Sequence, residues 1–335
     1  MQKGIWLHRF ALFTACCTFL LVIAGGLVTS TGSGLSVPDW PLSYGQLMPP
    51  MVGGVLYEHS HRMVATFVGM LTVTLAIWLW KKEERRWLRM VGVAAVAGVI
   101  TQGVLGGLTV LFLLPTWISV LHATIAQSFF SLMVFIALAT SEGWKQMQPY
   151  DLPEASRTRS LAVATTAVIL LQLMLGAWMR HSDAGLAITD FPLSYGAIVP
   201  STSAEDLMDV NDARIENGLA PVTAGQIWIH FAHRVGALVV LIMVYRLVRH
   251  VLATYKDDKR LREPVIILAT LVVMQALLGA LTVWTGKGVE IATAHVATGA
   301  LLLALSAFVA ARVFRLHPVE VHASNYSAVP ISTRP

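Results

Sequence analysis

The residues best suited to chemistry in this sequence are four histidines that recur as two matched sets. His61 and His233 are each followed by an arginine, and His122 and His295 recur at nearly the same separation. Two imidazoles that face each other across a helix bundle form a ligand pair for haem iron. The pattern therefore predicts two bis-histidine haem sites, one of His61 with His122 and one of His233 with His295. Zinc is disfavoured because no third ligand recurs in both copies.

Charged residues stand beside two of these histidines. Glu58 precedes His61 by three positions and so shares its helical face, whereas the second copy has His230 at that place. A carboxylate beside an iron ligand at a membrane boundary is costly, which indicates an acid–base group. The alternative is an acid favoured by the helix dipole. Arg62 and Arg234 are candidate partners of haem propionates, or else cations that extend to the membrane surface.

The elements that must position these groups are membrane helices. The chain of 335 residues is 56% hydrophobic and 13% charged, with mean hydropathy +0.66. A helix needs about 20 apolar residues to cross the hydrocarbon, and backbone groups in lipid must be paired internally. Eight stretches meet this length and predict an all-α polytopic membrane protein. They are residues 10–29, 59–80, 88–111, 117–139, 159–179, 228–250, 263–285 and 290–312.

The chain repeats itself beyond the histidines. LSVPDWPLSYG (35–45) returns as LAITDFPLSYG (186–196), and QGVLGGLTV (102–110) returns as QALLGALTV (275–283). Four helices per copy give both copies one orientation, so we expect two tandem four-helix bundles related by a pseudo-two-fold axis along the membrane normal. The repeated loop is either an interfacial anchor or a lid over a bound group, and the histidines favour the lid.

The same pattern sets the expected domain boundaries. The N-terminal bundle spans residues 1–143 and a cytoplasmic linker spans 144–158. The C-terminal bundle spans 159–315 and a cytoplasmic tail spans 316–335. The acidic stretch 201–221 is an insertion in the second copy, for which the sequence indicates no role.

The basic charge follows membrane topology. Most of the 24 Lys and Arg residues fall in segments that share one side if the N-terminus is cytoplasmic. Both termini are then cytoplasmic, the histidine pairs lie near the outer face, and nucleic-acid binding is not implied. The only cysteines, Cys16 and Cys17, lie in the first apolar stretch, so no outer loop has a disulfide. No mitochondrial transit pattern precedes this stretch, which favours a bacterial plasma membrane.

These motifs together resemble the haem A synthase family over about residues 8–315. The resemblance rests on GGLVTSTGSGL, DWPLSYG, EHSHR, VLHATIAQS, GAWMRHSDAGL, DFPLSYG, HFAHR and TAHVATGAL. It implies an oxidoreductase that converts the methyl group at ring position 8 of haem O to a formyl group, through a hydroxymethyl intermediate. The product serves haem–copper oxidases.

The resemblance also implies roles for the matched residues. His61 and His122 would hold the substrate haem O, His233 and His295 would hold a haem b cofactor, and Glu58 would be catalytic. Many relatives have a cysteine pair in the first outer loop, whereas this chain has Val37 and Ser43 there. Possible partners are a haem O synthase, an unknown electron acceptor and further copies of this chain.

Two other function classes are compatible with parts of the pattern. A dihaem b-type membrane cytochrome that exchanges electrons with quinone explains four histidines but does not require Glu58. A transporter is suggested by internal repeats, but the ionisable residues cluster at the outer ends rather than at the midplane.

Overall fold

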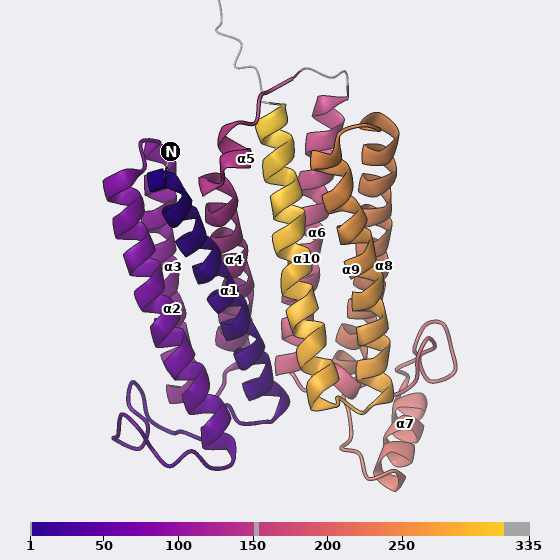
Figure 1. Cartoon of the computed structure of the whole chain (residues 1–335). Helices are drawn as coiled ribbons and strands as arrows, with labels where there is room; N and C mark the ends of the chain where they lie inside the picture. Colours follow the sequence, from indigo (N-terminus) through magenta and orange to yellow (C-terminus); the bar gives the residue numbers. More distant parts are fainter. Residues whose placement is uncertain (1, 151–153, 318–335) are drawn as a thin grey trace, which may run out of the picture.

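The computed structural model describes residues 2–150 and 154–317, and eight of its helices are long and apolar enough to cross a membrane (Figure 1). They are α1 (Gln2–Ser30), α2 (Gly54–Lys82), α3 (Arg86–Leu111), α4 (Thr116–Thr140), α6 (Ala155–His181), α8 (Ala224–Thr254), α9 (Lys259–Trp284) and α10 (Val289–Leu316). Each contains one of the eight predicted stretches to within one residue. The predicted all-α membrane fold is confirmed.

Three short elements connect or follow these helices. They are α5 (Glu142–Lys145), the 3-10 turn η1 (Ala184–Leu186) and α7 (Ala204–Glu216). The insertion in the second copy folds as α7 because Ser203 caps it, accepting the backbone N–H of Asp206 at 3.1 Å. The predicted linker 144–158 contains the end of α5 and the start of α6, while residues 151–153 and most of the predicted tail (318–335) lie outside the described residues.

The helices pack as two groups of four. In the first, α1 and α3 each pack against α2 and α4; in the second, α8 and α10 each pack against α6 and α9. The groups stand side by side in Figure 1 and meet where α10 packs on α1 and α4, and where α4 packs on α6. The fold therefore consists of two adjacent four-helix bundles. The pseudo-two-fold relation between them stays a prediction.

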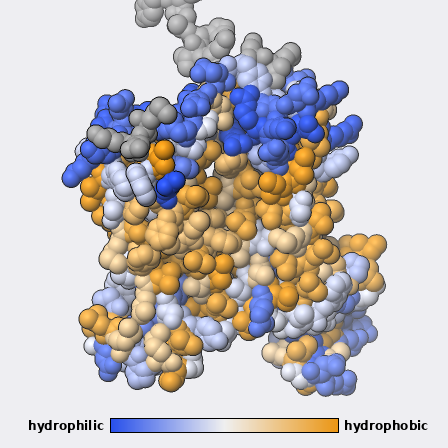
Figure 2. All heavy atoms as spheres, viewed as in Figure 1, coloured by the Kyte–Doolittle hydropathy of each residue, from blue (hydrophilic) through white to orange (hydrophobic). Residues whose placement is uncertain are grey.

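The main apolar core of each bundle lies toward the end that carries the N-terminus. The first core includes Leu75, Leu79 and Met133, and the second includes Leu247 and Leu268, all fully buried. Figure 2 shows an apolar belt between two polar ends, with the densest hydrophilic surface at the N-terminal end. Since the cores occupy this half, the opposite half of each bundle is left for the histidines.

Candidate functional site

The structure brings the four candidate histidines together in the two expected pairs. His61 on α2 lies within electrostatic range of His122 on α4, and His233 on α8 lies within the same range of His295 on α10. In each bundle the two helices that carry the pair are separated along the sequence by a third helix. The pairing is therefore a product of the bundle fold.

A glycine on a neighbouring helix makes room for each imidazole. A Cβ atom at these glycines would lie between 2.8 and 3.4 Å from the Cε1 atom of the facing histidine. A Cβ atom would require the ring to shift at Gly25, Gly176 and Gly279, most of all at Gly176, and would just touch the ring at Gly106. The glycines therefore allow a close approach of each ring to the neighbouring helix. The pairs are Gly25 with His61, Gly106 with His122, Gly176 with His233, and Gly279 with His295.

The donor set suits haem iron better than a bare metal ion. Within residues 2–150 and 154–317, no three His, Cys, Asp or Glu side chains form a cluster that could hold a metal. Two histidines per site suit an iron whose other ligands come from a porphyrin. The Nδ1 atoms of His61, His122 and His295 are buried and have no hydrogen-bond partner among the described residues. Coordination through the ring would offset part of the cost of burying these imidazoles.

The two sites differ in the support given to the first histidine. Gln172 of α6 places its Nε2 atom 3.1 Å from Nδ1 of His233 and donates to the His233 carbonyl at 2.8 Å. The first copy has Leu21 at the corresponding position. A Cβ atom at Gly236 would lie 2.1 Å from Oε1 of Gln172, and the first copy has Val64 there. An amide therefore fits beside His233, whereas only apolar groups occupy the matching positions near His61.

Sequence reasoning missed Gln172, although a signal was present. The residue is a polar interruption of an apolar stretch at a position where the first copy is apolar. Unlike Gln172, a glutamine beside the other histidine of each pair is present in both copies. Gln102 donates to the carbonyl of His122 at 3.2 Å, and the Gln275 amide lies 3.5 Å from Nε2 of His295.

Glu58 holds the loop 35–45 against α2. Its Oε2 accepts the backbone N–H of Val37 at 2.8 Å, and its Oε1 forms an ion pair with Arg62 at 2.6 Å. In the second copy, Nδ1 of His230 accepts the matching N–H of Ile188 at 3.2 Å. The two side chains, a carboxylate and an imidazole, therefore do the same structural work for their loops.

The two candidate propionate partners are engaged with loop backbone. Arg62 donates to the carbonyls of residues 37, 39 and 42 at 2.7 to 3.2 Å. Arg234 donates to the carbonyls of residues 188, 190 and 193 at 2.7 to 3.2 Å. Both guanidinium groups thus fasten a loop beside the histidine that precedes them. Their pairing with propionates stays a prediction.

The loops have the same internal hydrogen bonds. The Asp39 carboxylate accepts the backbone N–H groups of Tyr44 and Gly45 at 2.7 and 2.8 Å, and Asp190 repeats this with Tyr195 and Gly196. The Gly45 and Tyr44 N–H groups hold the pKa of Asp39 below its usual range. These polar contacts give the two loops the same internal shape.

The two loop positions at which the resemblance leads one to expect cysteine are buried here. Val37 and Ser43 are buried, and Ser43 forms a hydrogen bond with Nδ1 of His59 at 2.8 Å. Cys16 and Cys17 are free, and the described residues contain no disulfide.

Trp40 of the first loop lies directly on Gly107 of α3. A Cβ atom at Gly107 would lie 2.7 Å from Cδ2 of the indole. The corresponding residues in the second copy are Phe191 and Ala280, a smaller ring and a larger helix residue. Each copy therefore balances the size of the loop ring against the size of the helix residue.

Gly107→Ala is expected to displace the loop 35–45 and lower stability by about 1–3 kcal/mol, the usual cost of overpacking. Adding Trp40→Phe should restore most of the loss, because the double variant reproduces the combination of the second copy. Thermal unfolding in detergent and protease cleavage within the loop measure the two effects. A harmless Gly107→Ala, or a double variant no better than the single one, would show that the ring does not fix this loop.

His181 lies closer to the first site than its sequence position suggests. It is the last residue of α6 and lies within electrostatic range of His122. Its carbonyl accepts a hydrogen bond from Thr116 of α4 at 3.0 Å, and the preceding Arg180 donates to Ser30 of α1 at 2.8 Å. The end of α6 therefore joins the two bundles beside both sites.

Comparison with known proteins agrees with this architecture. The COX15-CtaA family, described as cytochrome oxidase assembly protein, matches residues 8–54 and 53–307. The chain is 27% identical to a heme A synthase of Lysinibacillus sphaericus, covering 91% of this chain and 94% of that one. It is 29% identical to a heme A synthase of Alkalihalophilus pseudofirmus (86% and 91%) and 26% identical to one of Geobacillus kaustophilus (98% and 97%). With the match covering most of its length, the chain belongs to the COX15-CtaA family of cytochrome oxidase assembly proteins.

Proposed function

We propose that this protein is a haem A synthase, which oxidises the methyl group at ring position 8 of haem O to a formyl group in two steps. The names of its relatives support this activity. The observation that carries it is the asymmetry between two otherwise matched histidine sites. Glu58 stands where the second copy has His230, and Leu21 stands where it has Gln172. A pure electron carrier would not need this difference.

The asymmetry supports different occupants for the two sites. In the C-terminal bundle, residues 159–315, His233 and His295 would hold haem b, and the Gln172 amide would orient the first ligand. Haem b there would supply one-electron redox chemistry. In the N-terminal bundle, residues 1–143, His61 and His122 would hold the substrate haem O with less polar support. A substrate site must release its product, so weaker support of the ligand suits it.

Glu58 is the proposed acid–base residue because it precedes His61 on the same helix face. Both of its carboxylate oxygens are engaged, one by the N–H of Val37 and one by Arg62. The carboxylate is also buried, so we propose that the loop 35–45 moves away from α2 when Glu58 exchanges a proton with a substrate. Loop opening and exposure of the carboxylate would then be one event.

The membrane orientation follows from the same polar ends. The more hydrophilic of the two polar ends in Figure 2 is the end at which the N-terminus lies. We place this end in the cytoplasm according to the positive-inside rule. The histidines then lie near the outer face of a bacterial plasma membrane. The electron acceptor and a haem O synthase partner would be separate molecules.

The test is to purify the protein from membranes that make haems B and O, extract the haems with acid acetone and separate them by chromatography. Haem B together with haem O, haem A or the hydroxymethyl intermediate supports the synthase. Haem B alone, at two per chain, would instead identify a dihaem electron carrier and remove the proposed role of Glu58.

Gln172→Leu, which copies Leu21, is expected to weaken retention of haem b by about tenfold to a hundredfold, the usual cost of removing a residue that orients a metal ligand. Adding Gly236→Val fills the space that the amide leaves, so the double variant separates a lost hydrogen bond from a cavity. Haem transfer to an excess of a soluble haem acceptor gives the release rate, and the low-spin spectrum shows whether ligation persists.

The reciprocal double variant, Leu21→Gln with Val64→Gly, should slow product release from the first site. If the Gln172→Leu variant releases haem b at the wild-type rate, Gln172 does not position the His233 ring.

A further inference from the structure

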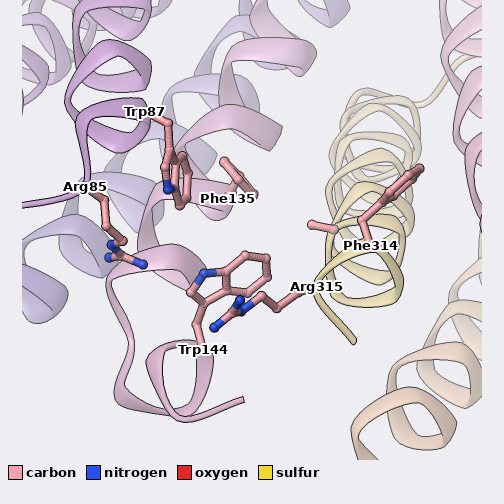
Figure 3. Close-up of a pocket in the computed structure, with 7 residues that line it drawn as sticks. Arg85, Trp87, Phe135, Trp144, Phe314 and Arg315 are labelled. Carbon is pink, nitrogen blue, oxygen red and sulfur yellow. The ribbon is translucent and has the colours of Figure 1, made fainter. Parts of the chain in front are cut away.

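A cavity of about 470 Å³ lies between the two bundles at the end that carries the N-terminus (Figure 3). Its first wall comes from the N-terminal bundle and its second wall comes from α10. The N-terminal bundle provides Arg85, Trp87, Phe135 and Trp144, and α10 provides Ala311, Phe314 and Arg315. The cavity lies where α10 passes the inner ends of α3 and α4, beyond the tight contact of α10 with α1 and α4.

The charge in this cavity is unbalanced. Arg85 is paired: it bonds Glu83 at 2.8 and 2.9 Å and the Ala139 carbonyl at 2.8 Å. Arg315 has no hydrogen bond or ion pair within the described residues, and its Nε atom is buried without a partner. None of the described residues that line the cavity is acidic. Within this lining, Arg315 is therefore the guanidinium group that an anionic occupant can pair with.

The lining changes from polar to aromatic with depth. Arg85, Trp144 and Arg315 lie at the ends of their elements, and Figure 3 shows both guanidinium groups near the Trp144 indole. Phe135 lies five residues inside the end of α4, which is about 7 Å deeper along the helix. Tryptophan and arginine at the membrane surface with apolar rings below them match the order of a phospholipid headgroup above its acyl chains.

We propose that this cavity binds one phospholipid with an anionic headgroup, whose phosphate pairs with Arg315. Its acyl chains lie along Phe135 and along Ala311, which is about one helical turn deeper than Arg315 on α10. The lipid fills the gap between the bundles and joins α10 to the N-terminal bundle. Basic pockets between membrane helices on the cytoplasmic side bind anionic headgroups in this way. This inference is independent of the haem chemistry proposed above.

The test is native mass spectrometry of the full chain released from nanodiscs that contain phosphatidylglycerol and phosphatidylcholine. Wild type is expected to retain one phosphatidylglycerol in preference to phosphatidylcholine. Arg315→Gln should lower that retention about fivefold or more, and Arg315→Lys should preserve most of it. Arg246→Gln is the matched control, because Arg246 is an exposed cation of α8 that does not line the cavity.

Each other outcome overturns the proposal. Equal loss in the Arg315 and Arg246 variants would mean a diffuse attraction to the basic surface. Equal retention of the two lipids would mean that the headgroup charge is not recognised. Displacement of the lipid by inorganic phosphate at millimolar concentration would identify a free anion as the ligand.

Discussion

His233→Ala is expected to leave the purified protein without the haem b proposed for the C-terminal bundle. The histidine is one of the two proposed axial ligands, and its ring is held by Gly176 and the Gln172 amide. Retention of haem b should fall by more than about a hundredfold. Removing a residue that only orients a metal ligand costs up to about that much, and removing the ligand itself should cost more. Pyridine haemochrome analysis and the low-spin absorption spectrum measure the loss. Haem A production should fall with it.

His61→Ala is the matched variant in the other bundle. It removes the corresponding residue, which packs on Gly25 as His233 packs on Gly176. Haem b should stay at one per chain, while haem O no longer copurifies and no haem A is formed. If the two variants instead lose the same haem to the same extent, the assignment of different occupants to the two bundles is wrong.

Glu58→Gln is expected to lower haem A formation by about a hundredfold to ten-thousandfold, the range that general acid–base groups contribute. Glutamine has the same shape and can still accept the N–H of Val37, but it cannot exchange a proton or pair with Arg62. Haem b content should not change. Turnover of haem O in membranes and the haem b spectrum are the two measurements.

Arg62→Gln separates chemistry from loop anchoring. It removes the ion pair and three loop contacts but keeps the carboxylate. A smaller loss of activity than in Glu58→Gln supports the acid–base role. Equal losses would mean that Glu58 only fastens the loop, as His230 does in the second copy.

The sequence was sufficient to predict the helices and the histidine pairs. Long apolar runs determine the eight spans, and the repeat places His61 and His122 on alternate helices, so any four-helix bundle brings them near each other. The four facing glycines belong to the same repeat. These features depend on periodicity and spacing, which a sequence displays directly.

The contacts between side chains and loop backbone could not be predicted. Arg62 follows a proposed iron ligand, which suggests a propionate partner, and the structure adds contacts from its guanidinium to carbonyls of the loop 35–45. Which carbonyls turn toward it depends on the path of the loop, and this path follows from the N–H groups that Asp39 and Glu58 accept. The contact between Gln172 and His233 likewise depends on how α6 rotates against α8.

The anchoring of the two loops also bears on how a duplicated protein acquires a new activity. One backbone N–H is accepted by a carboxylate in the first copy and by an imidazole in the second, while the surrounding loop geometry is the same. A mutation between these two residues can therefore be inherited without loss of the loop. Selection could then act on the reactivity of that side chain alone. One half could become catalytic while both halves kept the same fold.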